Sequence, residues 1–401
     1  MKGKTAQKNK SIYMDYAAAT PVSSEVISAM KPFLSEQFGN PGSIHNLGIL
    51  ANKALEKGRK DIAMVLGAKT EEIIFTSGGT ESDNLAILGA ANFFKRISKG
   101  KKLHIITTKI EHHAVLKPIK FLEMNGFEVT YISVSKKGIV NVTDIKKAIK
   151  ENTILISVMY ANNETGSIQP IREIGNMIKE FREDRAYPLF HTDACQAPGA
   201  LNLQVSNLRT DLMSFSGAKI YGPKGSGFLY IKKGTHIDPI IFGGEQEGGL
   251  RSGTQNVPEI AGMAKAFKMA DEKRKDESAR LLKLRDYFIS SVKKAITKCE
   301  LNGDEKLRLP NNANIYFQGI SGEQLVIELD AKGVMISAGS ACSSREDTPS
   351  HVLLSMYGSE ERANSSVRFT FGRDTDKKKI DFVIKTLKDI IKRLRSQKKE
   401  V

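Results

Sequence analysis

Residues 188–217 read "PLFHTDACQAPGALNLQVSNLRTDLMSFSG" and contain two short apolar runs, 188–194 and 211–217, on either side of a polar connection. Runs of this length and composition are typical of buried strands bounded by turns. Further runs of the same kind occur at 102–108, 128–134, 153–161 and 227–233. Amphipathic stretches between them, such as 113–125 and 171–183, indicate helices. Strands that alternate with helices predict an α/β fold whose mainly parallel sheet is covered on both faces.

The pattern changes near residue 257, where a long helical periodicity begins and continues to about residue 296. After it come strand-like runs at 313–319, 334–341 and 365–372, and then a basic amphipathic helix. We therefore predict a large domain over residues 24–268. Residues 1–23 and 269–401 are expected to form a smaller α+β domain.

The 401-residue chain has a net charge of +16, and part of the excess lies at its two ends. No stretch approaches the roughly 20 apolar residues that a bilayer-spanning helix needs. The basic N-terminal residues are not followed by the apolar core of a secretory signal. We expect a cytoplasmic protein with no membrane partner. Aromatic and basic residues do not alternate in the way that stacks bases, so direct nucleic-acid binding is not expected.

The three cysteines, Cys195, Cys299 and Cys342, are widely spaced along the chain. Such spacing provides neither a disulfide framework nor a paired metal-binding motif. We predict no metal site, and at most one or two of the thiols are expected to have a chemical role.

The segment "FTSGGTESDNLAI" (75–87) has the form of a strand, a glycine turn and a helix that begins near Glu81. Thr80 and Asp83 have the spacing of a capping box. A helix start with exposed N–H groups and neighbouring glycines suits an anion such as phosphate. Many helix starts share this pattern without a ligand, so both interpretations stay open.

Two ionisable residues follow predicted buried strands at their carboxyl ends. Asp193 needs a partner there because burying an unpaired charge is costly, and either a protonated ring nitrogen or a helix cap would serve. Lys219 follows the run at 211–217, where a desolvated lysine can act as a nucleophilic amine. Lys224, in the glycine-rich "GPKGSG", is a competing candidate.

A pair of histidines, His112 and His113, follows the strand predicted at 102–108. Tandem side chains point in different directions, so at most one of them is expected to face a site. A phosphate-binding helix start, an acid, a lysine and a histidine are together the groups that pyridoxal phosphate requires.

With these features, the chain resembles the cysteine desulfurases, the NifS/IscS-like group of the class V aminotransferase family. The resemblance implies a fold type I, aspartate aminotransferase-like enzyme that uses pyridoxal 5'-phosphate and works as a homodimer. The spacing from Ser343 to His351 is similar to that of the long-loop members, group I. The matching motifs are "YMDYAAATPV" (13–22), "FGNPGSIH" (38–45), "FTSGGTESDNLAI" (75–87), "EHHAVL" (111–116), "NNETG" (162–166), "HTDACQ" (191–196), "DLMSFSGAKIYGPKG" (211–225), "RSGTQNVP" (251–258), "LNGD" (301–304), "GSACSS" (339–344) and "SVRFTFGR" (366–373).

The resemblance implies roles for individual residues. Lys219 would form the Schiff base with the cofactor, Asp193 would pair with the pyridine nitrogen, and His112 would stack on the ring. Asn163 and Gln196 would contact the ring hydroxyl. Gly79, Thr80 and Ser216 would hold the phosphate, and Thr254 would reach the phosphate from the other subunit.

For the substrate, the resemblance implies that Asn40 and Arg368 bind the α-carboxylate of L-cysteine. Lys219 would remove the Cα proton, and the Cys342 thiolate would attack the substrate sulfur, leaving L-alanine and a persulfide on Cys342. The small residues in "AGSACSSREDTPS" (338–350) predict a mobile loop that presents this sulfur to an acceptor. A scaffold of iron–sulfur cluster assembly and a thiolation enzyme are both possible acceptors.

Two alternatives to a cysteine desulfurase stay open from the sequence. A selenocysteine lyase would use the same cofactor with a heavier chalcogen. A catalytically impaired homologue with a regulatory or binding role is the other. Ala218 favours that second alternative, because family members usually carry a histidine at this position.

Replacing Ala218 by histidine should strengthen cofactor binding. If the usual histidine donates to the phosphate, Ala218→His restores one charge-assisted hydrogen bond, worth about 1.5–3 kcal/mol. Equilibrium titration of the apoprotein with pyridoxal phosphate measures the gain. Unchanged affinity in the variant would contradict this interpretation of position 218.

Overall fold

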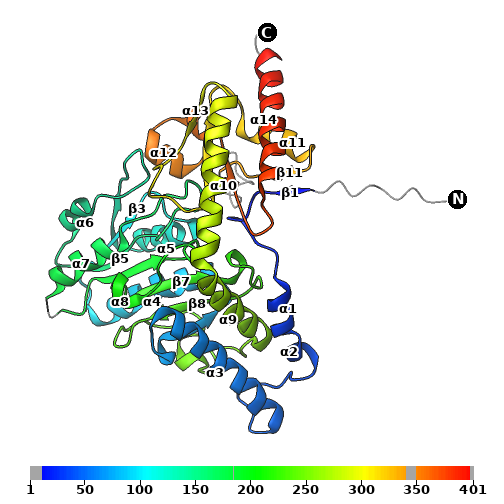
Figure 1. Cartoon of the computed structure of the whole chain (residues 1–401). Coiled ribbons are helices and arrows are strands. Elements are labelled where there is room, and N and C mark those ends of the chain that lie inside the picture. The colour runs from blue at the N-terminus through cyan, green and yellow to red at the C-terminus, as the bar shows by residue number, and fades with distance from the viewer. Residues whose placement is uncertain (1–10, 184, 340–348, 398–401) are drawn as a thin grey trace. The chain divides into compact units, whose positions relative to one another are not determined.

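The computed structural model describes residues 11–183, 185–339 and 349–397 (Figure 1). They belong to two compact units. The larger unit comprises 19–163 and 167–276, and the smaller one comprises 164–166 with the described residues of 1–18 and 277–401. The domain boundaries predicted from the sequence were residues 24 and 268. No helix in the described part of the chain is both long enough and apolar enough to cross a membrane.

The larger unit is built on a seven-stranded sheet with the order β2-β8-β7-β6-β5-β3-β4. Only β8 runs antiparallel to its two neighbours, and the other neighbouring strands pair in parallel. The prediction of a mainly parallel sheet is therefore confirmed. The strands are β2 (Ile73–Thr76), β3 (His104–Thr108), β4 (Glu128–Ile132), β5 (Thr153–Ser157), β6 (Leu189–Asp193), β7 (Leu212–Ser216) and β8 (Gly227–Ile231).

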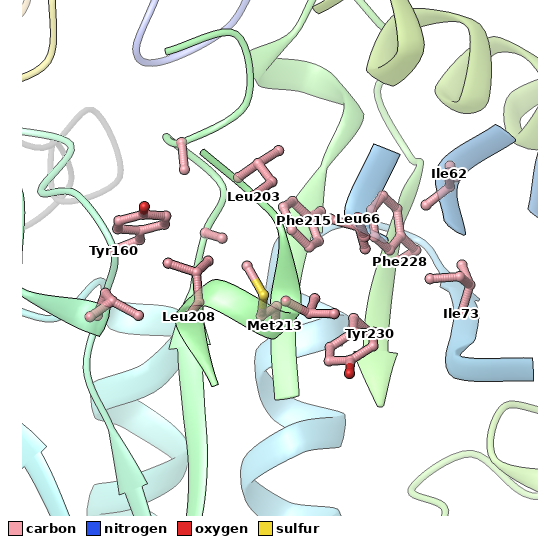
Figure 2. Packing of buried hydrophobic residues seen from close by; sticks show 14 of the residues in the cluster. Ile62, Leu66, Ile73, Tyr160, Leu203, Leu208, Met213, Phe215, Phe228 and Tyr230 are labelled. Atoms are coloured by element: carbon pink, nitrogen blue, oxygen red, sulfur yellow. The ribbon is translucent and has the colours of Figure 1, made fainter. Parts of the chain in front are cut away.

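One face of this sheet packs against helices α3 (Asn46–Leu66), α7 (Ile171–Arg182) and α9 (Val257–Glu272). Figure 2 shows the apolar side chains that meet there, among them Met213, Phe215 and Phe228. The rings of Phe215 and Phe228 stack with their centroids 4.5 Å apart. Burying side chains of this size supplies the main drive for folding, at about 1.5–3 kcal/mol each.

The opposite face packs against α4 (Gly79–Ile97) and α5 (His113–Met124). Because side chains alternate along a strand, Leu189 and Leu212 face α4 while Phe190 and Met213 face the other layer. By the same alternation, His191 and Ser214, two positions beyond these leucines, also lie on the α4 side. Both polar residues are therefore between the sheet and α4.

Two helix predictions need correction. The helix expected near Glu81 begins at Gly79, with Gly78 as its N-cap, and Thr80 and Asp83 form no capping box. Instead, the carboxylate of Glu81 accepts from the backbone N–H of Ser77 at 2.8 Å. The long helical pattern after residue 257 is two helices, α9 and α10 (Arg274–Ala295), because α9 ends at a C-cap on Lys273.

Shorter helices complete the larger unit: α1 (Ser24–Met30), α2 (Pro32–Ser35), α6 (Val142–Ala148), α8 (Val205–Leu208) and the 3-10 turns η1 (Thr70–Glu72), η2 (Gly217–Lys219) and η3 (Glu247–Gly249). Helix α9 packs along both α1 and α3, as Figure 1 shows.

A buried ion pair ties α3, β2 and η3 together. The guanidinium of Arg59 donates to both carboxylate oxygens of Glu247 at 2.9 Å, and both residues are buried. The same carboxylate accepts from the backbone N–H of Phe75 at 2.9 Å, and Arg59 also donates to the carbonyl of Ile73. Burial alone would lower the pKa of Arg59, but the hydrogen bonds and charge of Glu247 raise it.

The smaller unit contains a three-stranded antiparallel sheet in the order β12-β10-β9 and a parallel pair, β1-β11. Helices α10, α11 (Gly322–Asp330) and α14 (Lys377–Gln397) pack on its apolar core. Arg368, on β12, is buried and forms an ion pair with Asp15 at 2.7 Å. The remaining elements are β1 (Ile12–Tyr13), β9 (Cys299–Leu301), β10 (Asn312–Phe317), β11 (Val334–Met335), β12 (Ser366–Thr370), α12 (His351–Tyr357) and α13 (Glu360–Asn364).

Breaking the buried ion pair should destabilise the protein strongly. Glu247→Gln removes the buried carboxylate partner of the Arg59 guanidinium and leaves only Glu56, which is half exposed, opposite it at 3.2 Å. Breaking a buried ion pair in this way costs about 3–5 kcal/mol of the free energy of unfolding. Urea denaturation followed by circular dichroism measures the change.

Glu71→Gln is the matched control, because Glu71 pairs with Lys233 at 3.6 Å on the surface, where an ion pair contributes little. Equal destabilisation by the two glutamine substitutions would contradict a special role for the Arg59–Glu247 pair.

Candidate active site

The carboxyl ends of three neighbouring strands lie side by side in the larger unit. Parallel pairing sets Ser157 of β5 beside His191 of β6, and Asp193 of β6 beside Ser214 of β7. The strands therefore deliver Asp193 and Ser216 to the same edge of the sheet, where ligands of such sheets bind.

The turn between β2 and α4 is shaped by glycines that admit no side chain. A Cβ on Gly227 would lie 2.6 Å from the Cα of Gly78, and a Cβ on Gly79 would lie 2.5 Å from the Sγ of Cys195. The backbone of Gly78 has a φ of 148°, which favours glycine. The start of the 19-residue helix α4 therefore packs closely against Cys195 and Ser216, and the first N–H groups of a helix can bind a phosphate.

The turn that carries Lys219 is held by Thr20. The Thr20 hydroxyl donates to the carbonyl of Ala218 at 3.0 Å and accepts from the backbone N–H of Tyr221 at 2.7 Å. Lys224, the competing lysine, donates its ammonium to the Thr20 carbonyl at 2.9 Å. Lys224 therefore has a structural contact in this turn, and Lys219, which is half-buried at the end of η2, is the better candidate for chemistry.

His112 is the N-cap of α5. Its Nδ1 accepts from the backbone N–H of Ala114 at 3.1 Å, which assigns the proton of the neutral ring to Nε2. A hollow of about 560 Å³ is lined by both histidines and by residues of α4 and α5, including Thr80, Asn84, Lys117 and Phe121. His112 and Thr80 therefore line the same hollow.

Asp193 is buried at the end of β6, and its Oδ1 accepts from the backbone N–H of Cys195 at 2.9 Å. Burial, and then the negative charges of Asp193 and Asp83, raise the pKa of the Cys195 thiol well above its ordinary value. The neutral thiol is therefore the favoured form of Cys195.

Two buried acids near Asp193 were not identified from the sequence as site residues. The Oε1 of Glu111 accepts from the Thr108 hydroxyl at 2.6 Å and from the backbone N–H of Met159 at 2.9 Å. Burial raises the pKa of Glu111 to about 8. Asp83, in the second turn of α4, is also fully buried, and burial followed by the charge of Asp193 raises its pKa well above the ordinary value. Among the described residues, no three acidic, histidine or cysteine side chains converge as metal ligands would.

These residues fit pyridoxal phosphate. The first N–H groups of α4 could take the phosphate, and the carboxylate of Asp193 at the end of β6 could pair with a ring nitrogen. Lys219 lies on the turn that directly follows β7, which neighbours β6. The amide side chains of Asn163 and Gln196 follow β5 and β6, and both residues are half-buried.

The structure does not gather every residue that the resemblance implies. Thr254 lines a separate hollow of about 270 Å³ with Ser77 and Asn256. Asn40 is exposed, and its Oδ1 accepts from the backbone N–H of Gly42 at 2.9 Å. Arg368 belongs to the smaller unit, and Cys342 lies outside the described residues, as do 340–348 as a whole.

Comparison with known families matches residues 12–383 to the aminotransferase class-V family. The chain is 50% identical over 387 residues to the cysteine desulfurase IscS of Dictyoglomus turgidum, covering 96% of each chain. It is 48% identical over 389 residues to the cysteine desulfurase IscS of Methanosarcina thermophila, covering 97% of this chain and 94% of the other. A putative cysteine desulfurase, IscS 1, of Bacillus subtilis is 45% identical, with 96% and 99% covered.

Solved structures agree with these relatives. A NifS-like protein superposes with a TM-score of 0.88 at 36% identity, covering 95% of this chain and 99% of the other. SspA in complex with cysteine gives a TM-score of 0.78 at 37% identity, covering 90% of this chain and 98% of the other. The expected fold type I architecture is thereby confirmed.

Replacing Glu111 by glutamine should change how stability depends on pH. With a pKa near 8 in the folded state and about 4.5 in the unfolded state, the folded protein holds a proton that the unfolded chain has lost between these values. Rising pH therefore destabilises the wild type by up to about 1.4 kcal/mol per unit through this group. Glutamine has no proton to lose, so the free energy of unfolding of Glu111→Gln should rise relative to wild type from about pH 5 to pH 8.

Urea titrations at several pH values measure this difference. Glu323→Gln, on the exposed side of α11, is the matched control for the removal of one carboxyl group. A difference between Glu111→Gln and wild type that stays constant or falls with pH would contradict a protonated Glu111.

Proposed function

This chain belongs to the class-V aminotransferase family and is a pyridoxal-phosphate-dependent cysteine desulfurase, and from that premise we propose how its residues divide the reaction. The assignment of this activity rests on the 50% identity to a cysteine desulfurase across 96% of both chains. The substrate is L-cysteine, and the products are L-alanine and enzyme-bound sulfur.

Pyridoxal phosphate supplies an electron sink that stabilises negative charge at the substrate Cα. The start of α4 at Gly79 and Thr80, with Ser216 beside it, would bind its phosphate through backbone N–H groups and hydroxyls. Support comes from the close approach of Ser216 to Gly79 and from the place of Thr80 beside His112.

Asp193 would hold the ring nitrogen in its protonated form. The backbone N–H of Cys195 orients this carboxylate through the 2.9 Å hydrogen bond to Oδ1. His112 would cover the ring, with Nε2 able to donate a proton because Nδ1 is already an acceptor. Asn163 and Gln196 would contact the ring hydroxyl from the loops after β5 and β6.

Lys219 would bind the cofactor and then remove the Cα proton of L-cysteine. The Thr20 contacts to Ala218 and Tyr221 fix the turn that contains Lys219. A fixed turn limits the positions that the Lys219 amine can reach, which favours a reactive orientation. Asn40 and Arg368 would bind the substrate carboxylate, because a guanidinium fork suits two oxygens.

The Cys342 thiolate would attack the substrate sulfur. A sulfur–sulfur bond forms, the carbon–sulfur bond of the substrate breaks, and the electron pair that it leaves on carbon takes up a proton to give L-alanine. Neither Cys195 nor Cys299 suits this role, because burial raises the pKa of both thiols.

The chain is proposed to act as a cytoplasmic homodimer in which Thr254 reaches the phosphate of the partner's cofactor. The position of Thr254 in a hollow apart from Gly79 is compatible with that assignment. The persulfide is proposed to pass to a sulfur-acceptor protein, in iron–sulfur cluster assembly or in a thiolation pathway. The net charge of +16 favours an acceptor with an acidic surface.

Removing the proposed nucleophile should separate sulfur release from cofactor binding. Cys342→Ala is expected to abolish sulfide release from L-cysteine in the presence of a reductant, because no thiolate then attacks the substrate sulfur. The visible absorption of the bound cofactor should stay as in the wild type.

Cys299→Ala is the matched control, since the Cys299 thiol already donates to the carbonyl of Ile296 at 3.1 Å and lies on β9. Full sulfide release by Cys342→Ala would show that another group is the nucleophile.

A further inference from the structure

Asp83 is a buried acid that the proposed reaction does not use. It lies in the second turn of α4, one turn beyond Gly79, and is 1% exposed. Its Oδ1 has no hydrogen-bond partner among the described residues, and the Nε2 of His191 is 3.5 Å away. A carboxylate in such a place would be costly to keep charged without a cation opposite it.

His191 does not supply that cation. It is fully buried on β6, with Nδ1 2.8 Å from the Ser157 hydroxyl and Nε2 3.0 Å from the Ser214 hydroxyl. Burial lowers the pKa of His191 to about 4, so the ring is neutral in the physiological range. His191 on β6 and Ser214 on β7 are therefore neutral neighbours of Asp83.

The charged groups that act on Asp83 are also acids. After burial, the largest influence on its pKa is the negative charge of Asp193 on β6, and Glu111, from the connection between β3 and α5, acts in the same direction. The Ser214 hydroxyl is the one neighbour that opposes them, by hydrogen bonding. Because like charges in a buried site repel, each of these acids disfavours the ionised form of Asp83.

We propose that Asp83 is a positioning residue that is held as a neutral carboxylic acid against the His191 ring and the Ser214 hydroxyl, and leaves the charge of the site on Asp193. This inference rests on the proposed role of Asp193 toward the ring nitrogen.

The geometry favours Asp193 as the charged member. Asp193 stands at the open end of β6, and the N–H of Cys195 donates to it, which stabilises a carboxylate. Asp83 lies deeper, between α4 and the sheet, where its Oδ1 faces a neutral imidazole. A carboxylic acid kept neutral by its surroundings is a good hydrogen-bond donor, and enzymes use such groups near developing charge.

An ionised Asp83 would change the site. Its negative charge would favour the protonated form of Asp193, and a protonated Asp193 could no longer hold a ring nitrogen in its charged form. Neutrality of Asp83 therefore preserves the ion pair that the cofactor needs. Glu111 is placed in the same way, with its proton retained by burial.

Two substitutions in the holoenzyme test the proposal. Asp83→Asn imitates a neutral acid in size and hydrogen bonding, so the pH midpoint of the bound cofactor's visible absorption should shift by less than about 0.3 unit. Asp83→Ala removes the carboxyl group that faces His191 and Ser214, so the affinity for pyridoxal phosphate should fall about threefold to tenfold, the effect of one buried hydrogen bond.

Either of two results would overturn the proposal. A midpoint that shifts by about one unit or more in Asp83→Asn would show that Asp83 is charged in the wild type. Wild-type affinity and midpoint in both variants would show that Asp83 does not act on Asp193.

Infrared spectroscopy keeps the test decisive if Asp83→Ala does not fold. The wild-type holoenzyme at neutral pH should show the carbonyl band of a protonated carboxylic acid that Asp83→Asn lacks. A second such band should disappear in Glu111→Gln. Absence of the Asp83 band in the wild type would refute neutrality.

Asp193→Asn separates this proposal from the proposed function. If that variant leaves the cofactor's midpoint unchanged, the assignment of Asp193 to the ring nitrogen fails, whatever the infrared result for Asp83. If the midpoint shifts but the Asp83 band is absent, only the inference about Asp83 fails.

Discussion

Parallel pairing of β5, β6 and β7 is the constraint on which the rest of the site depends. Because these strands run in the same direction and in register, their carboxyl ends share one edge of the sheet. Asp193 at the end of β6 and the Ser216–Lys219 turn after β7 therefore come together although they are separated along the chain. The antiparallel strand β8 adds Gly227 against Gly78, which shapes the start of α4 at the same edge.

Most of the fold could be predicted because hydrophobic periodicity reports burial directly. The six strand-like runs from 102 to 233 correspond to β3–β8, and the helices expected at 113–125 and 171–183 are α5 and α7. The break at Lys273 could not be predicted, because the helical pattern continues through it and only the C-cap geometry ends α9.

The polar groups of the site were only partly predictable, for the same physical reason. Asp193 ends β6 and Lys219 follows β7 by three residues. A charged residue at the end of a buried strand is unusual, so both could be noticed in the sequence. Asp83 and Glu111 were missed because their burial depends on the packing of α4 and of the β3–α5 connection against the sheet, which periodicity does not encode. Lys224 could be set aside only when its contact with Thr20 was visible.

Cys342 is proposed to receive the sulfur of L-cysteine. The most direct measurement is the mass of the holoenzyme after brief exposure to L-cysteine without reductant, followed by peptide mapping. We expect one added sulfur atom on the peptide that contains Cys342, together with free L-alanine. Sulfur found on Cys195 or Cys299, or alanine formed with no sulfur on any cysteine, would contradict it.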